Sequence, residues 1–401
     1  MLQTFTKVDP AVTAETLLDD VRALLPAIRS RAEETEKNCS IPMVSAQEFL
    51  DIGLARVLMP KRYGGTELGL QTWVDVSVEI GKADASHAWC ASLMMHHPHY
   101  LAQFEDAAQH EVWANGPDVA IAATFTPTSK VEIVEGGYRI SCAIPYLSGI
   151  NHSSRVMIGG RVPLDDGTFD WTLFLVPGSE FEIQKTWDTS GMRGTGSNTV
   201  IAEKIFVPAH RVQPVETLAK GQSPRTHKDE FIYRESFMPT AVIAVAPPIL
   251  GMAQAARDLT LERINTASKP IAYSFYDDLR KAPSMQLQLA QASTLIDAAV
   301  LLMGRWSDDI ANAARAGEEF AFTKRAQLRM DIGYAMKCCR EAVDLLLSVQ
   351  GASAFAESNP IQRVWRDLEM ASRHGLLSGE VPHEIYGRAL VGNFDALSPF
   401  V

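Results

Sequence analysis

The chain has 401 residues, 46% of them hydrophobic and 21% charged, and a globular chain of this length has roughly two or three domains. Its formal net charge is −11, and short basic clusters such as Lys61-Arg62 lack the Lys/Arg stripe that nucleic-acid binding requires. We find no run of about 18 uncharged apolar residues and no secretion-signal core, so we expect a cytoplasmic protein without a membrane role.

Cysteine usage also indicates a reducing compartment. The five cysteines are odd in number and none forms a CxxC pair, which argues against a disulfide framework and against a zinc ribbon. We expect reduced, mostly buried thiols at Cys39, Cys90, Cys142, Cys338 and Cys339.

Helical spacing of apolar residues dominates the first third of the chain. It runs from Thr13 to Asn38 with one apolar face, and Ser45-Ala-Gln-Glu48 has the form of a capping box that begins a second helix. Further helical patterns cover Gln71–Gly81, Asp84–Phe104 and Ala107–Trp113. We therefore predict an all-α domain over residues 1–117.

Short β-rich runs bounded by turn residues follow from Val119 onwards. The clearest spans Val131–Ser141, where Gly136-Gly137 accepts the positive φ of a tight hairpin turn. Further strands are predicted at Ser154–Val162, Phe169–Val176, Phe181–Trp187 and Ser197–Val207. Residues 118–212 thus form a predicted middle domain of β-barrel type.

Long helical patterns return in the last part of the chain. A polar stretch with Pro and Gly, Gln213–Glu230, is interpreted as a surface loop. The helical patterns cover Phe231–Ile264, Met285–Ala314, Phe322–Val349 and Ile361–Ser372. Residues 213–401 are predicted to form a four-helix-bundle domain. The fold class is α+β, without the βαβ alternation, the GxGxxG or the GxxxxGK[ST] motif of nucleotide-binding domains.

Four motifs occur in order along this three-part layout. They are Pro60-Lys-Arg-Tyr-Gly-Gly65, the stretch from Trp187 to Ser197, Val207-Pro208 and Arg363-Val-Trp-Arg-Asp367. Together they resemble the acyl-CoA dehydrogenase superfamily over nearly the whole chain. Within it, Pro145-Tyr-Leu-Ser-Gly149 with His152, and Arg366-Asp367 followed by His374, are similar to the group D two-component monooxygenases, typified by 4-hydroxyphenylacetate hydroxylase.

The carboxylate base distinguishes the two branches of this superfamily. A dehydrogenase removes an α-proton from a thioester and needs a carboxylate at the flavin. The resemblance places this base eight residues beyond Asp367, where the chain has Gly375, or in a minority at Ala241. Neither position is acidic. This favours the monooxygenase over the alternative, an acyl-CoA-dehydrogenase-like enzyme with FAD; a non-catalytic helical scaffold is the third interpretation.

The resemblance implies three catalytic residues. Ser148 matches the serine near flavin N5, although a turn serine with local backbone bonds is the alternative. His374 matches a residue over the reactive edge of the flavin, where a near-neutral pKa lets it take a proton from a phenol or indole; the alternative is a histidine placed by the helix dipole. His97 matches a histidine at the substrate.

The resemblance also implies the residues that hold the flavin. Thr124 lies on the strand that meets the flavin pyrimidine, and Ser148 and Gly149 lie beside N5. Arg193 in the glycine-rich turn, and Arg263 with its bidentate guanidinium, are candidates for the phosphate. Gly351 begins a turn by which a neighbouring subunit reaches the cofactor. Each of these residues has an ordinary structural alternative, such as a plain strand, a strand-connecting turn or a solvated arginine.

Two further features concern the pocket. The His96-His-Pro-His99 cluster lacks a carboxylate or Cys at ligand spacing, so we expect no metal site and assign His96 and His99 to packing or the surface. Related aromatic hydroxylases have Trp at the position of Ile144, which leaves the pocket shape and the substrate open.

The sequence thus predicts the oxygenase component of a flavin-dependent monooxygenase. As the resemblance implies, it binds reduced FMN, with FADH2 as the alternative, receives it from a separate NAD(P)H-flavin reductase, and hydroxylates a phenolic or indolic small molecule through a C4a-hydroperoxyflavin. A homotetramer is expected, and neither nucleic acid nor membrane is expected as a partner.

Overall fold

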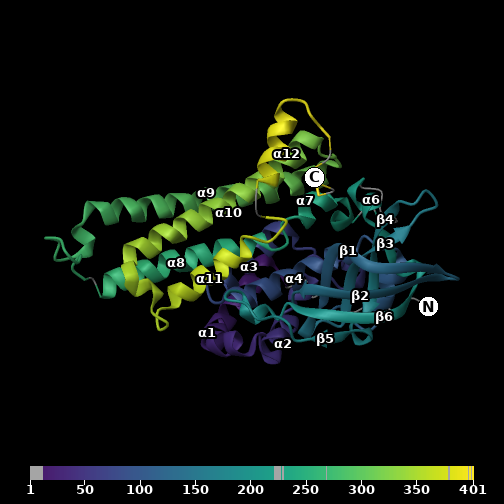
Figure 1. The fold of residues 1–401 in the computed structure, drawn as a ribbon, viewed down its shortest axis with the longest axis horizontal. Helices are drawn as coiled ribbons and strands as arrows, with labels where there is room; N and C mark the ends of the chain where they lie inside the picture. Colours follow the sequence, from purple (N-terminus) through teal and green to yellow (C-terminus); the bar gives the residue numbers. More distant parts are fainter. Residues whose placement is uncertain are drawn as a thin grey trace.

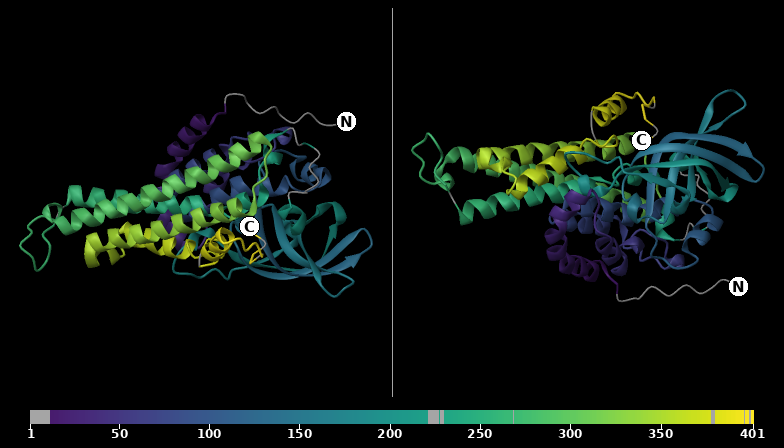
Figure 2. Two further views of the ribbon diagram at one scale, coloured as in Figure 1. Left: turned by 90° about the horizontal axis from the view of Figure 1, so that it is seen from above. Right: turned by 60° about the horizontal axis from the view of Figure 1, so that its bottom comes forward.

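The computed structural model describes residues 12–220, 227, 230–267, 269–377, 380–395, 397–398 and 400–401. A β sheet lies at one end of the molecule and a long helical bundle extends from it, while the N-terminal helices pack at their junction (Figures 1 and 2). The predicted α+β layout, with helices first, then a sheet, then a helical bundle, is confirmed. The domain boundaries after residues 117 and 212 stay predictions.

Twelve α-helices and seven strands form the described part of the chain. The helices are α1 Ala14–Asn38, α2 Met43–Asp51, α3 Gly69–Gly81, α4 Ala85–Leu101, α5 Asp106–Trp113, α6 Val215–Ala219, α7 Phe237–Ala241, α8 Ala246–Thr266, α9 Pro283–Ala316, α10 Phe322–Gln350, α11 Pro360–Ala371 and α12 Val381–Leu390. The strands are β1 Ile121–Val134, β2 Gly137–Leu147, β3 Arg155–Pro163, β4 Phe169–Pro177, β5 Glu182–Gln184, β6 Asn198–Pro208 and β7 Val212–Pro214.

The strands form one sheet in the order β5-β6-β2-β1-β3-β4-β7. Only the β1–β3 pair is parallel among the described pairs; the others are antiparallel. The predicted hairpin joins β1 to β2, and Gly136 takes the positive φ of its turn, 77°. The apolar core of the sheet domain includes Ile140, Ile158 and Val200, which are fully buried.

The bundle consists of α8, α9, α10 and α11, which run side by side away from the sheet (Figure 1). Trp73 on α3 and Trp306 on α9 are both fully buried, and their ring centroids lie 6.2 Å apart. These two side chains join the N-terminal helices to the bundle in one continuous core.

The second helix does not begin with the capping box that the sequence suggests. α2 begins at Met43 after Pro42, and no side chain caps it. The Ser45 hydroxyl instead contacts Arg31 Nη1 and His87 Nε2, each at 3.0 Å. Ser45, which the sequence pattern predicted as a helix cap, therefore takes part in tertiary hydrogen bonds instead.

The first predicted bundle helix is interrupted. The segment Phe231–Ile264 contains a short helical turn, then α7, and only at Ala246 does α8 begin, with prolines at its N-terminus. Because proline lacks an N–H, Pro247 and Pro248 suit the first turn of a helix but not its interior. The prolines therefore divide a segment that apolar spacing presents as continuous.

Two described segments are long and apolar enough to span a bilayer by length and composition, which the sequence analysis did not anticipate. The segment Phe237–Thr266 has an apolar window that is 94% buried, as in the core helix of a folded protein. The window in Pro283–Ala316 is 22% buried. α9 thus carries an apolar face that the single chain leaves open.

The crossing of α3 and α8 generates a test of the packing. A Cβ at Gly251 would lie 2.4 Å from Val78 O and 2.9 Å from Gly81 Cα. We expect Gly251→Ala to lower the free energy of unfolding by at least about 2 kcal/mol, because the two backbones must separate. Gly304→Ala on α9, where a Cβ meets nothing within 4 Å, should leave stability unchanged or raise it by up to about 1 kcal/mol. Urea denaturation of both variants decides this, and equal losses would contradict it.

Candidate functional site

Ser148 lies just beyond the end of β2, where the sheet meets the N-terminal helices. Its Oγ accepts the indole N–H of Trp89 at 3.1 Å and lies 2.7 Å from Ser197 Oγ. The next residue, Gly149, donates its N–H to Thr195 O at 3.1 Å. Ser148 is thus held by α4 on one side and by the glycine-rich loop on the other, and it is more than a turn serine with local bonds.

His374 follows α11 and faces the same region. Its ring centroid lies 5.9 Å from that of Trp89, edge to face. The side chain is exposed, yet protein surrounds it closely enough that burial lowers its pKa to about 4. This lowered pKa favours a neutral imidazole over the near-neutral titration that the sequence suggested, and the catalytic role of His374 stays a prediction.

His97 is buried on α4 and points at the first strand of the sheet. Its Nδ1 lies 2.6 Å from Ile121 O, and because a carbonyl only accepts, Nδ1 carries the proton and Nε2 keeps its lone pair. Burial lowers the pKa of His97 to about 4. The ring stacks on Tyr100 with centroids 5.2 Å apart. His97 therefore presents a neutral imidazole of fixed tautomer.

The other two histidines of the cluster are buried, so the surface alternative is wrong for both. His96 Nε2 lies 3.2 Å from Thr240 O, and His99 Nε2 lies 3.6 Å from Glu235 Oε2. Burial raises the pKa of Glu235 to about 8 and lowers that of His96. In the part of the chain that the structure describes, no three His, Cys, Asp or Glu side chains are grouped for a metal ion.

A small, partly open cavity lies next to Ser148. Its lining is mainly apolar, with a few hydroxyl groups and one imidazole, and comprises Ile41, Cys90, Leu93, Met94, Ala120, Ile121, Ser148, Gly149, His152 and Ser153. An apolar lining with a few polar groups is typical of small-molecule sites.

Thr124 lies on β1 where the strand pairing is irregular. The β1–β3 register shifts between Thr124 and Ser129, and the β1–β2 register begins at Lys130. Thr124 is half-buried, and its Oγ1 accepts the Thr126 N–H at 3.4 Å. Residues 125–128 have no ladder partner in these registers, although Phe125 O accepts the Trp171 indole N–H at 2.6 Å. The role of Thr124 stays a prediction.

Two aromatic residues of the quoted motifs, Tyr146 and Trp187, were not among the predicted site residues. Tyr146 has a left-handed φ of 64°, is 71% exposed, and meets the Trp187 ring edge to face at 5.8 Å. Such a conformation is unusual for a bulky residue and points to a local role. Ile144, by contrast, is 1% exposed in the β-domain core. Ile144 therefore does not determine the pocket wall.

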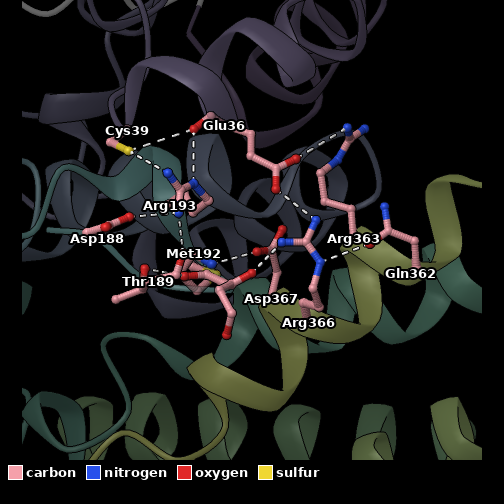
Figure 3. A network of polar contacts seen from close by, with 12 residues as sticks. Glu36, Cys39, Asp188, Thr189, Met192, Arg193, Gln362, Arg363, Arg366 and Asp367 are labelled. Carbon is pink, nitrogen blue, oxygen red and sulfur yellow. Dashed lines mark hydrogen bonds and ion pairs between the residues drawn. The ribbon is translucent and has the colours of Figure 1, made fainter. Parts of the chain in front are cut away.

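Arg193 has its guanidinium engaged within the protein (Figure 3). It donates to Asp188 Oδ1 at 3.0 Å and to Thr189 O at 2.6 Å, and its Nη2 lies 3.3 Å from Cys39 Sγ. These contacts tie the loop to the end of α1. Its assignment to a flavin phosphate stays a prediction, and these contacts favour a structural role.

A second network joins the same loop to α11 (Figure 3). Asp367 Oδ1 accepts the Met192 N–H at 2.5 Å, and Arg366 Nη2 donates to Glu36 Oε1 at 2.7 Å. Burial and then the nearby Asp84 raise the pKa of Asp367 to about 7, while the Met192 N–H opposes the shift. The Arg-Asp pair thus fixes the helix that ends just before His374.

Arg263 and Gly351 lie together at the other end of the bundle. Arg263 Nη2 donates to Ser353 Oγ at 3.2 Å, and Gly351 begins the short helical turn Gly351–Phe355 that contains this serine. α8 and α10 both end here, at the end of the bundle remote from the sheet (Figures 1 and 2). The predicted site residues therefore form two groups within one chain.

Comparisons with known proteins agree with this architecture. Family models of the acyl-CoA dehydrogenase N-terminal and C-terminal domains match residues 13–116 and 243–378. The flavin-dependent monooxygenase oxygenase subunit HsaA of Rhodococcus jostii (strain RHA1) is 33% identical over 92% of this chain and 97% of its own. The p-hydroxyphenylacetate 3-hydroxylase oxygenase component of Acinetobacter baumannii is 28% identical over 96% and 90%. The structure of XiaF from Streptomyces sp. with FADH2 and glycerol matches with a TM-score of 0.89, 29% identity and 97% coverage of both chains.

The low pKa of His97 predicts a pH-dependent loss of stability. In the unfolded chain, His97 has an ordinary pKa of about 6.5, whereas in the folded protein it takes up a proton only near pH 4. Stability contributed by the neutral ring is therefore present above about pH 6.5 and is lost as the pH falls toward 4. We expect the stability of wild type relative to His97→Gln to fall by up to about 3 kcal/mol over this window. Urea denaturation at several pH values measures it, and parallel pH profiles would refute it.

Proposed function

The chain belongs to the acyl-CoA dehydrogenase family, among the oxygenase subunits of flavin-dependent monooxygenases, and we propose that it hydroxylates an aromatic or heteroaromatic small molecule with O2 and reduced flavin. Reduced FMN is the preferred cofactor, with FADH2, which XiaF binds, as the alternative. The relatives are oxygenase subunits or components, which supports a separate NAD(P)H-flavin reductase as partner. The free cysteines support a cytoplasmic location.

The groups around Ser148 carry this proposal. A hydroxyl, an indole N–H and a neutral imidazole meet there, whereas Gly375 and Ala241 occupy the positions of the dehydrogenase base. The buried carboxyl of Asp367 accepts the Met192 N–H and so belongs to the loop contact. A site of this kind lacks the strong base that thioester dehydrogenation needs, and this supports oxygen transfer.

The residues present fit a flavin. Tyr146 offers an exposed ring for one face of a planar heterocycle, and the unpaired ladder positions near Thr124 suit the polar pyrimidine edge. Ser148, two residues after Tyr146, supplies a hydroxyl just beyond the end of β2, with Gly149 beside it. These groups form an apolar surface with a few directed polar atoms, as cofactor sites in proteins generally do.

Reduced flavin, when bound, supplies the electrons that activate O2; the protein positions, shields and hydrogen-bonds. Ser148 holds a directed hydrogen bond at the flavin N5 position, and the mainly apolar cavity beside it limits access of water. The lone pair on Nε2 of His97 accepts a hydrogen bond from the substrate hydroxyl or ring N–H. On the opposite element, the Leu376 N–H donates to His374 Nδ1 at 3.4 Å, so the neutral His374 ring carries its proton on Nε2 and offers a hydrogen-bond donor.

Arg263 and Gly351 are assigned to the flavin of a neighbouring subunit. Within one chain they lie at the remote end of the bundle, away from Ser148 (Figure 1). α9 exposes Leu287 and Leu301 at 71% and 74%, and exposed apolar faces of this kind mark association surfaces. A homotetramer through the bundles covers these leucines and brings the two groups of residues to one cofactor.

Anaerobic mixing with reduced FMN, followed by oxygen, tests the function. We expect the absorbance of oxidised flavin to return more slowly than for free reduced FMN, and about tenfold faster in Ser148→Ala, since one hydrogen bond of about 1.4 kcal/mol is lost. Ser30→Ala on α1, whose hydroxyl donates to Ala27 O at 2.8 Å, is the control and should match wild type. With a reductase, NADH and a panel of phenols and indoles, hydroxylated product should form; peroxide alone across the panel would disprove the proposal.

Subunit complementation tests the shared site. Ser148→Ala and Arg263→Ala should each lower turnover, by roughly tenfold and by about fivefold or less, because each removes one group from every flavin site. In tetramers reassembled from a 1:1 mixture, about a quarter of the sites combine an intact Ser148 with a neighbour's intact Arg263, and activity should return to about that share. Size-exclusion chromatography and turnover measure this. Activity that stays at the mean of the two variants would show that each chain builds its site alone.

A further inference from the structure

Ser148 is one end of a chain of three hydroxyl groups that runs into the protein. Ser148 Oγ lies 2.7 Å from Ser197 Oγ, which lies 2.7 Å from Thr195 Oγ1, and Thr195 Oγ1 lies 2.9 Å from Met192 O. Thr195 and Ser197 are each 3% exposed. Bulk water therefore does not compete for these bonds.

The direction of every proton in this chain follows from its two ends. Met192 O can only accept, so the 2.9 Å contact takes the Thr195 proton. Thr195 must then accept from Ser197, and Ser197 must accept from Ser148. At the outer end, the Trp89 indole can only donate, so its 3.1 Å contact ends on Ser148 Oγ. Ser148 thus gives its proton inward and presents a lone pair outward.

The outward lone pair distinguishes the two redox states of a flavin. N5 of oxidised flavin has a lone pair and no hydrogen, so it accepts, whereas N5 of reduced flavin carries a hydrogen and donates. Ser148 as found here is matched to reduced flavin. To serve oxidised flavin, all three hydroxyls must turn around, and Thr195 then gives up its bond to Met192 O.

We propose that Thr195 and Ser197 are positioning residues that hold Ser148 as an acceptor and thereby make the site prefer reduced over oxidised flavin. The inference rests on the proposed function, which places Ser148 at flavin N5. Turning the chain costs one hydrogen bond, because Met192 O loses the Thr195 hydroxyl and keeps only the Trp187 indole N–H at 2.9 Å and the Thr195 backbone N–H at 3.2 Å. One neutral hydrogen bond corresponds to roughly a two- to tenfold preference.

Thr195→Val tests the inference because it keeps the shape and removes the hydroxyl. Ser197 then has only Ser148 to donate to, and Ser148 turns its proton outward. We expect the ratio of Kd for oxidised FMN to Kd for reduced FMN to fall roughly two- to tenfold relative to wild type. Thr195→Ser keeps the hydroxyl and should keep the ratio. Ser197→Ala, which removes the acceptor of the Ser148 proton, should lower the ratio as Thr195→Val does.

A flavin-free measurement checks the proton direction itself. When Ser148 also accepts from Ser197, it becomes a poorer acceptor for Trp89, so the Trp89 indole proton should shift upfield in NMR spectra of Thr195→Val but not of Thr195→Ser. The signal is identified by its loss in Trp89→Phe. Unchanged Kd ratios in Thr195→Val and Ser197→Ala, with both FMN forms bound, overturn the inference and leave the proposed function standing. Failure of wild type to bind either form contradicts the proposed function, and the inference with it.

Discussion

The bond from the Met192 N–H to the Asp367 carboxyl, 2.5 Å long, is the contact on which the site depends. It joins the glycine-rich loop of the β domain to α11, and the two backbones approach so closely that a Cβ at Gly191 would lie 2.3 Å from Arg366 O. The loop carries Thr195 and Ser197, which direct Ser148, and α11 ends just before His374. One contact thus fixes both sides of the site, and Arg366 extends it to α1 through Glu36.

The ionisable groups on both sides of this contact have pKa values shifted toward the neutral form. Burial lowers the pKa of His97 and His374 to about 4 and raises that of Asp367 to about 7. A neutral imidazole with a pKa of about 4 is too weak a base to remove a proton from a phenol, but it can form a hydrogen bond with it. Unlike an imidazolium, it does not lower the electron density of a nearby aromatic ring. Hydrogen-bonding chemistry of this kind supports hydroxylation of an electron-rich ring and fits poorly with removal of a thioester α-proton.

Sequence alone predicted the elements whose signal is local and missed those that depend on tertiary contacts. The apolar spacing of Thr13–Asn38 and the Gly136-Gly137 hairpin were sufficient, since each is determined within one element. Ser45 misled because its hydroxyl serves Arg31 and His87 from other helices. Trp89 was missed for the same reason, because it lies 59 residues from Ser148 in sequence. On an apolar helix face, the sequence does not distinguish a tryptophan whose indole donates a hydrogen bond into a site from one that only fills the core. The resemblance to known families identified Ser148 and His374. The structure identified the side chains that contact them.

The division of site residues between the two ends of the bundle has a consequence for a flavin that must be exchanged with a reductase. Near Ser148 the described groups are neutral or apolar, so this region selects the redox state but adds little affinity from charge. The charged contact proposed for the phosphate, Arg263, lies at the remote end and is solvated in the single chain, where one exposed ion pair is worth about 1 kcal/mol or less. A cofactor held by a weak charge contact and a redox-dependent hydrogen bond is bound roughly two- to tenfold more tightly while reduced than once oxidised. Such exchange suits a two-component enzyme better than tight permanent binding, because each turnover needs a newly reduced flavin.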